Sequence, residues 1–183
     1  MQIVNISGKA EHGKDTLALI LKERLSKVGK SSLILHYGDY LKFLCKTLYG
    51  WNGVKDEAGR KLLQEVGTDK IRNVRPDYWV LSVANQVDLL QSINKLPDFV
   101  FVPDCRFPNE IEWWAEHGYN QRSVRVIRTN HISRLTEKQL QHPSETSLDD
   151  YKHFDFILTA ENMEGLDNVA ERLMQELIND IIL

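Results

Sequence analysis

Short continuous apolar runs alternate along the chain with longer stretches in which apolar residues recur every third or fourth position. Continuous runs of this length are typical of strands buried on both faces of a parallel sheet, and the recurring spacing is typical of amphipathic helices. The pattern predicts strands at 3–6, 33–36, 99–102, 124–127 and 156–158 and helices at 14–28, 40–48, 59–66, 78–92, 109–117 and 163–182. Repeated strand–helix order predicts an α/β fold with right-handed crossovers.

Two regions interrupt this alternation. About sixty residues separate the second and third predicted strands, more than one crossover helix needs, so residues 38–96 are expected to form a helical insert beside the sheet. Residues 129–150 are polar and lack apolar periodicity, and a segment of this length is typical of a lid over a site. We expect residues 1–183 to form one domain with these two additions.

A phosphate-binding motif follows the first apolar run directly. Gly8 and Gly13 stand five positions apart and Lys14 comes next, which is the spacing of a P-loop. Glycines let backbone N–H groups turn toward a phosphate chain, and the next helix adds its unpaired N–H groups and positive dipole end. The predicted phosphate-binding residues are Gly8, Ala10, Glu11, His12, Gly13, Lys14, Asp15 and Thr16. The alternative is a glycine-rich turn without a ligand.

The motif departs from the usual P-loop at one position. Asp15 stands where Ser or Thr normally contacts Mg²⁺. A carboxylate beside a polyphosphate is unfavourable unless a cation lies between them, so Asp15 either reaches Mg²⁺, directly or through water, or caps the helix start. Both roles remain open, and Thr16 is the better candidate for a hydroxyl contact to phosphate.

Charge and composition exclude several classes of function. The 23 basic and 26 acidic side chains give a net charge of −3, which disfavours a nucleic-acid-coating surface. Cys45 and Cys105 are too few for a disulfide framework and favour a reducing compartment. The sequence lacks an apolar run of 18 residues and a basic-then-apolar export signal. We therefore expect a cytoplasmic protein that binds neither membranes nor nucleic acid.

Further candidate residues follow the third predicted strand. Asp104 comes at the carboxyl end of Phe99-Val100-Phe101-Val102-Pro103, where ligands bind in open α/β sheets, and it is either a metal ligand or a helix cap. Arg106 suits phosphate oxygens, its alternative being a salt bridge to Glu110 or Asp104. In the predicted lid, His142 and Glu145 contact substrate or have only structural roles.

These residues carry a resemblance that spans nearly the whole chain. The P-loop, the block Asp-Cys-Arg-Phe-Pro-Asn-Glu at 104–110 and His-Pro-Ser-Glu at 142–145 occur in the order found in deoxynucleoside monophosphate kinases of the bacteriophage type. The stretch Leu-Leu-Gln-Glu-Val-Gly-Thr-Asp at 62–69 also resembles that family. Residues 38–42 are similar to the family's Ala-Asp-x-x-Lys segment, with Gly38 in place of alanine.

The resemblance implies a three-layer P-loop kinase fold with a five-stranded parallel sheet, and transfer of the γ-phosphoryl group of ATP, with Mg²⁺, to a (deoxy)nucleoside monophosphate. Lys14, Asp104 and Arg106 would be catalytic, and Asp15 and Asp104 would hold Mg²⁺. The acceptor would contact Asp39, Lys42, Gln64, Arg72, Trp79, Arg106, Glu110, His142 and Glu145. Arg128 and Arg134 would act from the lid, and Asn162 would line the adenine pocket or cap the last helix.

Other functions remain open at this point. A P-loop kinase could act on a non-nucleotide acceptor such as dephospho-coenzyme A, or the chain could be a regulatory module that binds ATP without an acceptor. The partners implied are small-molecule nucleotides, in the host cytoplasm if the chain is of phage origin, and a homodimer is left open. The acceptor of a nucleotide kinase is an already deprotonated phosphate oxygen, so Asp104 is expected to hold metal rather than to accept a proton.

Overall fold

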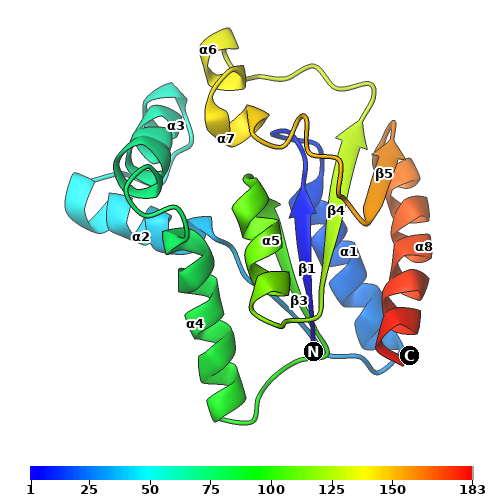
Figure 1. The fold of residues 1–183 in the computed structure, drawn as a ribbon. Helices are drawn as coiled ribbons and strands as arrows, with labels where there is room; N and C mark the ends of the chain where they lie inside the picture. The colour runs from blue at the N-terminus through cyan, green and yellow to red at the C-terminus, as the bar shows by residue number, and fades with distance from the viewer. Residues whose placement is uncertain (183) are drawn as a thin grey trace.

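The computed structural model describes residues 1–182 and contains one five-stranded sheet with helices on both sides (Figure 1). The strand order is β2-β3-β1-β4-β5, and every neighbouring pair is parallel. The strands are β1 (Gln2–Ser7), β2 (Ser32–Ile34), β3 (Phe99–Cys105), β4 (Gln121–Arg128) and β5 (Phe156–Ala160). This confirms the predicted α/β fold with five parallel strands.

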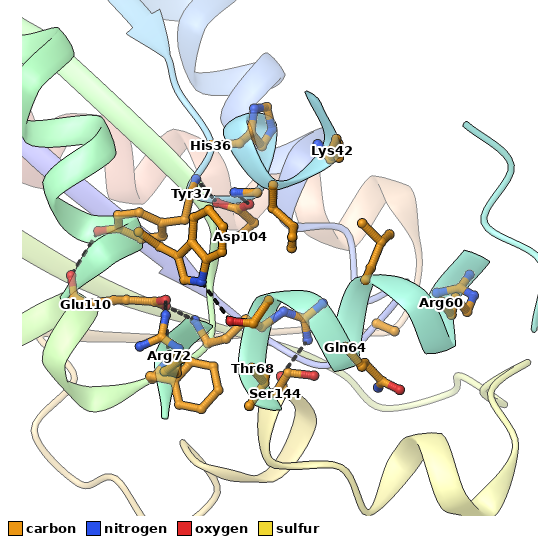
Figure 2. Close-up of a pocket in the computed structure, with 18 of the residues that line it drawn as sticks. His36, Tyr37, Lys42, Arg60, Gln64, Thr68, Arg72, Asp104, Glu110 and Ser144 are labelled. Carbon is orange, nitrogen blue, oxygen red and sulfur yellow. Dashed lines mark hydrogen bonds and ion pairs between the residues drawn. The ribbon is translucent and has the colours of Figure 1, made fainter. Parts of the chain in front are cut away.

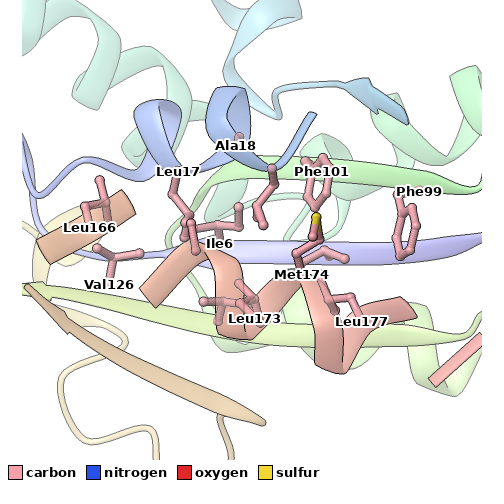
Figure 3. Close-up of a cluster of buried hydrophobic side chains, with 14 of the residues drawn as sticks. Ile6, Leu17, Ala18, Phe99, Phe101, Val126, Leu166, Leu173, Met174 and Leu177 are labelled. Atoms are coloured by element: carbon pink, nitrogen blue, oxygen red, sulfur yellow. The ribbon is translucent and has the colours of Figure 1, made fainter. Parts of the chain in front are cut away.

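Helices cover each face of the sheet. Leu17, Leu21 and Leu25 of α1 (Lys14–Lys27) pack with Leu173 and Leu177 of α8 (Met163–Ile182) on one face, and all five are buried (Figure 3). On the other face a second buried cluster joins α4 (Tyr78–Ser92) to α5 (Pro108–Glu116). The three-layer arrangement is confirmed, and the leucine stripe of α1, with a leucine at every fourth position, explains why this helix docks here.

The insert between β2 and β3 is helical, as predicted, but the helix predicted at 59–66 continues beyond its predicted end. After α2 (Gly38–Tyr49) and α3 (Glu57–Gln64), the chain continues as a π-helix, η1 (Glu65–Arg72). The indole N–H of Trp79 donates to the carbonyl of Gly67 at 2.8 Å, and this buried contact supports the wide turn. Such turns depend on tertiary contacts, so the apolar periodicity alone predicts a helix that ends near residue 66.

Residues 129–150 lie over the carboxyl ends of the strands, close to the loop between β1 and α1 (Figure 1). This segment was predicted without regular structure, but it holds two one-turn helices, α6 (Glu137–Leu140) and α7 (Pro143–Thr146). Each begins with a cap: Thr136 and Gln139 bond reciprocally, and His142 Nδ1 accepts from the N–H of Ser144 at 3.2 Å. The capping pattern was the available signal for these helices.

Tyr37 connects the insert to the sheet. Its buried hydroxyl lies 2.8 Å from Asn5 Oδ1 and 2.9 Å from the carbonyl of Glu110, and it accepts from the indole N–H of Trp114 at 2.8 Å. Burial raises the pKa of Tyr37 well above its usual value, so it remains a neutral donor. One phenol therefore fixes the start of α2 against β1 and α5.

Cys45 and Cys105 are buried free thiols. Within residues 1–182, none of the helices combines the length and apolar character that a bilayer crossing requires.

We predict that Tyr37→Phe lowers the free energy of unfolding by about 1–3 kcal/mol, because the buried indole N–H of Trp114 loses its acceptor. Urea denaturation measures the change. The control is Tyr119→Phe, which removes an exposed hydroxyl contact with Asp88 and should change stability by less than about 0.5 kcal/mol. Equal effects of the two variants would contradict the anchoring role of Tyr37.

Candidate active site

The loop between β1 and α1 has the backbone of an anion cradle. Gly8 adopts φ 155°, and a Cβ at that position would lie 2.6 Å from the carbonyl oxygen of Val126 on β4. Gly13 adopts φ 94° and is the N-cap of α1, with no side chain bonding the free N–H groups of the first turn. Both glycines are therefore required by the backbone, and the helix N-terminus stays available to an anion.

Lys14 lies inside this loop and is 5% exposed. Its Nζ donates to the carbonyl oxygens of Gly8 and Lys9, both at 2.7 Å. Burial, with a smaller contribution from Arg106, lowers the pKa of Lys14 to about 7. The ammonium is therefore poorly compensated by the protein alone, and a bound phosphate would stabilise its charged form.

Asp15 is exposed and belongs to a chain of charged groups. His36 Nε2 lies 3.1 Å from Asp15 Oδ1, and His36 Nδ1 lies 3.3 Å from Asp39 Oδ2. Lys42 donates to Asp39 Oδ1 at 2.8 Å. The hydrogen bond between His36 and Asp15 lowers the pKa of Asp15 and raises the pKa of His36. Of the two roles considered for Asp15, helix capping is not seen, since α1 has no side-chain cap.

Asp104 lies at the N-terminus of α2. Its Oδ1 accepts from the N–H of Tyr37 at 2.9 Å, and its Oδ2 accepts from the N–H of Gly38 at 2.8 Å. A Cβ at Gly38 would lie 3.1 Å from that Oδ2, so glycine eases the close approach. The carboxylate from β3 thus caps a helix of the insert while the group itself faces the cavity described below.

A buried ion pair joins the insert to the first turn of α5. Arg72 NH2 pairs with Glu110 Oε1, and both side chains are less than one-tenth exposed. Glu110 Oε2 also accepts from the N–H groups of Arg106, at 2.6 Å, and Phe107, at 3.1 Å. Burial raises the pKa of Glu110 while Arg72 opposes the shift. The guanidinium lies 3.8 Å over the Phe107 ring, so Arg72 is held on several sides.

One cavity of about 420 Å³ extends from the P-loop to the insert (Figure 2). Its cationic lining residues come from four separate segments: Lys14, Lys42, Lys55, Arg60, Arg72 and Arg106. Its apolar lining residues include Leu41, Leu63, Trp79 and Phe107. Gln64 and Thr68 also line the cavity and stand four positions apart in the sequence.

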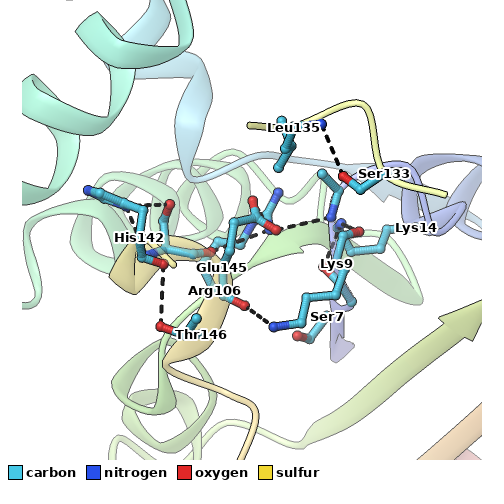
Figure 4. A network of polar contacts seen from close by, with 12 residues as sticks. Ser7, Lys9, Lys14, Arg106, Ser133, Leu135, His142, Glu145 and Thr146 are labelled. Atoms are coloured by element: carbon cyan, nitrogen blue, oxygen red, sulfur yellow. Dashed lines mark hydrogen bonds and ion pairs between the residues drawn. The ribbon is translucent and has the colours of Figure 1, made fainter. Parts of the chain in front are cut away.

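The segment 129–150 is held against the P-loop by ion pairs (Figure 4). Glu145 Oε1 accepts from Arg106 NH1 at 2.7 Å, and Glu145 Oε2 accepts from the N–H of Ala10 at 3.1 Å. Lys9 Nζ donates to the carbonyl of Glu145 at 2.6 Å and to Asp149 Oδ2 at 2.5 Å. The Glu145 carboxylate therefore bonds the Ala10 N–H of the P-loop, a donor that a phosphate oxygen would otherwise bond.

The remaining lid and adenine candidates lie away from this cavity. The Arg128 N–H donates to His12 Nδ1 at 3.2 Å, and Arg128 Nε is buried without a partner among the described residues. Arg134 is exposed. Asn162 Oδ1 accepts from the N–H of Gly165 at 2.9 Å, which is the capping geometry considered for it from the sequence.

The structure brings together many, but not all, of the residues predicted from sequence. Those lining the cavity are Ala10, Glu11, Lys14, Asp15, Lys42, Gln64, Arg72, Trp79, Asp104, Arg106 and Glu110. Asp39 instead lines a second cavity between α2 and α4, and His142 and Glu145 line neither. Sequence reasoning missed His36, Lys55 and Arg60. His36 was assigned to the end of the second predicted strand, and isolated basic residues in a helical insert, such as Lys55 and Arg60, resemble an ordinary solvated face, so no signal marked them.

The donor set fits a magnesium ion bound together with a nucleotide. Across the part of the chain that the structure describes, no three His, Cys, Asp or Glu side chains gather into a metal-binding group. Mg²⁺ bound to phosphates needs only one or two carboxylates, because phosphate oxygens and water fill the other positions. Asp15 and Asp104 line the same cavity beside Lys14 and meet that requirement.

Comparison with family models and with curated proteins finds no match. Solved structures with a similar fold include the APS kinase CysC (Cys556Ala mutant) of Mycobacterium tuberculosis, 16% identical with a TM-score of 0.47 over 97% of this chain and 96% of that one. Shikimate kinase of Bacteroides thetaiotaomicron is 15% identical with a TM-score of 0.45 over 97% and 98%. The site described above does not depend on these likenesses.

We predict that nucleotide binding at pH 8 is accompanied by proton uptake close to one proton per site. Lys14 has a pKa of about 7 in the free protein, so it is mostly neutral at pH 8 and becomes charged when phosphate raises its pKa. Calorimetric titration with ADP in Tris and in HEPES, which differ in ionisation enthalpy, measures the uptake. Lys14→Arg is always charged and should bind without uptake. Buffer-independent heats for the natural protein would contradict this.

We predict that Glu110→Gln lowers the free energy of unfolding by about 3–5 kcal/mol, because it leaves the buried Arg72 charge without a counter-ion. The double variant with Arg72→Met should recover part of the loss. Glu116→Gln, an exposed change at the end of the same helix, is the control and should cost less than about 0.5 kcal/mol. A loss of that small size for Glu110→Gln would show that the pair does not stabilise the fold.

Proposed function

We propose that this chain is a kinase that transfers the γ-phosphoryl group of ATP to a (deoxy)nucleoside monophosphate. The observation that carries the proposal is the single cavity that joins the P-loop and Lys14 to a cationic, partly apolar pocket in the insert. A module that binds only ATP has no need for the second half of this cavity. In this proposal residues 38–96 bind the acceptor, residues 129–150 form a lid, and the chain works as one domain.

The pocket lining matches the parts of a nucleoside monophosphate. Arg106, Lys42 and Arg60 would attract the phosphate dianion, which would lie between them and the P-loop. The apolar wall that contains Trp79 would contact the base, and Gln64 and Thr68 would supply hydrogen bonds to its polar edge. Dephospho-coenzyme A is the alternative acceptor, so the acceptor assay must include both compounds.

The chemistry requires positioning and cationic stabilisation. An acceptor phosphate oxygen is already deprotonated near pH 7, so no side chain has to remove a proton. Both oxygens of Asp104 accept backbone N–H groups at the start of α2, which holds the carboxylate in place at the cavity. Asp15 and Asp104 would hold Mg²⁺, which supplies positive charge to the phosphates when bound. Lys14 and Arg106 would stabilise the charge that spreads over the transferred group.

We predict that deoxynucleoside monophosphates stimulate ADP formation from ATP and Mg²⁺, and that dephospho-coenzyme A does not. A coupled ADP-release assay with the four deoxynucleotides and their ribose counterparts measures this. Lys14→Ala should lower the turnover number at least about 100-fold, because the P-loop loses its buried cation. Slow hydrolysis that no monophosphate stimulates would contradict the proposal and favour an ATP-binding regulatory module.

We predict that Thr68→Val changes the ratio of kcat/KM between preferred and poor bases by about tenfold, because one buried hydrogen bond to the base is lost. The same panel of acceptors measures the ratio. Ser82→Ala is the control, since Ser82 bonds the Trp79 carbonyl from outside this cavity. An unchanged ratio in Thr68→Val would exclude contact between this hydroxyl and the base.

A further inference from the structure

The carboxylate of Glu145 bridges the two halves of the proposed active site. It projects from α7, is 7% exposed, and touches the Ala10 N–H of the P-loop at 3.1 Å and Arg106 NH1 at 2.7 Å (Figure 4). The two partners lie on segments far apart in the sequence, and each of the two carboxylate oxygens serves one of them. Such a bridge is unusual for a lid residue because the P-loop amides are the donors that hold phosphate.

An N–H group of the P-loop together with an arginine is the donor pair that a phosphoryl group takes. Carboxylate and phosphate both present anionic oxygens at hydrogen-bond distance, and one N–H cannot be fully bonded to both. Glu145 and a phosphoryl group at this place would therefore compete for the Ala10 N–H and for Arg106. Repulsion between two unscreened anions a few ångströms apart adds to the steric conflict.

We infer that Glu145 stands in for the γ-phosphoryl group in the unliganded protein and is displaced by a nucleoside triphosphate but not by a diphosphate. The inference rests on the proposed function for the identity of the ligand. The γ-phosphoryl group is assigned because Arg106 lies toward the acceptor cavity, and the end of the triphosphate that faces the acceptor is the γ end. Displacement also frees Arg106 to contact the transferred group.

The lid need not detach when Glu145 leaves. Lys9 holds the backbone carbonyl of Glu145 at 2.6 Å and Asp149 at 2.5 Å, and Arg125 NH2 donates to the other oxygen of Asp149 at 3.1 Å. These contacts do not use the Glu145 carboxylate. A side-chain rotation on α7 is therefore sufficient, and Asp149 serves as a matched carboxylate that holds the lid without occupying the phosphate site.

The test compares the affinities of AMPPNP and ADP in the natural protein, Glu145→Gln and Asp149→Asn, by calorimetry at one pH and Mg²⁺ concentration. Removing the charge at Glu145 should tighten AMPPNP about tenfold and leave ADP within about twofold, because only AMPPNP carries the competing group. Asp149→Asn should change both nucleotides by the same factor. Glu145→Ala, checked by circular dichroism for native helix content, should reproduce the selective gain.

Other results would overturn the inference. Weaker AMPPNP binding in Glu145→Gln and Glu145→Ala would mean that Glu145 supports the ligand, and an equal gain for both nucleotides would mean that a loosened lid is responsible. In either case the proposed function stands, because nucleotide still binds. If neither nucleotide binds the natural protein, the proposed function fails and this inference fails with it.

Discussion

A loop built to hold phosphate gathers buried N–H groups and a buried ammonium, and without a ligand the protein itself must bond them. Here Lys14 donates to two carbonyls of its own loop, and Glu145 accepts from a loop amide. The two carbonyl bonds do not fully compensate the burial of the Lys14 ammonium, since burial lowers the pKa of Lys14 to about 7. The P-loop is therefore held in a conformation that a polyphosphate would stabilise, and the rest of the site is arranged around this requirement.

The helical insert is tied to the centre of the sheet through the end of β3 and the first turn of α5. Asp104, near the end of β3, caps α2, and Glu110, in the first turn of α5, pairs with Arg72 of η1. The two carboxylates are close together in the sequence. Arg106 lies between them and takes its direction from the bond of its N–H to Glu110. Because the segment 104–110 fixes both the insert and Arg106, small changes in this segment should move the insert relative to the P-loop.

Local patterns were sufficient to predict the strands, the long helices and the P-loop. The leucine spacing of α1 and the apolar run of β3 depend only on neighbouring residues, so these elements were predicted to within a few positions. The strand order was not predicted, because pairing between distant strands leaves no local signal. The π-helix was missed for a related reason: its Gly67 carbonyl accepts from Trp79, which lies 12 positions further along the chain, in α4.

Many of the residues that line the cavity were predicted from the sequence, but their contacts were not. Motif spacing indicated Lys14, and Asp104 and Arg106 were predicted from their position after the third apolar run. The amide bonds of Asp104 and the Arg72–Glu110 pair became visible only when α2 and η1 were placed. Lys55 and Arg60 belong to no recognisable motif, and only their position in the lining of the cavity marks them as site residues. Sequence thus predicts which groups can act, and tertiary packing determines which of them face one another.

The central claim is that triphosphate and acceptor phosphate meet in one continuous cavity. Calorimetry with four bisubstrate compounds, each linking adenosine through five phosphates to one deoxynucleoside, tests it most directly. The account predicts that at least one compound binds about a hundredfold more tightly than AMPPNP, because both halves of the cavity are filled by one molecule. Affinities no greater than that of AMPPNP for all four would contradict it.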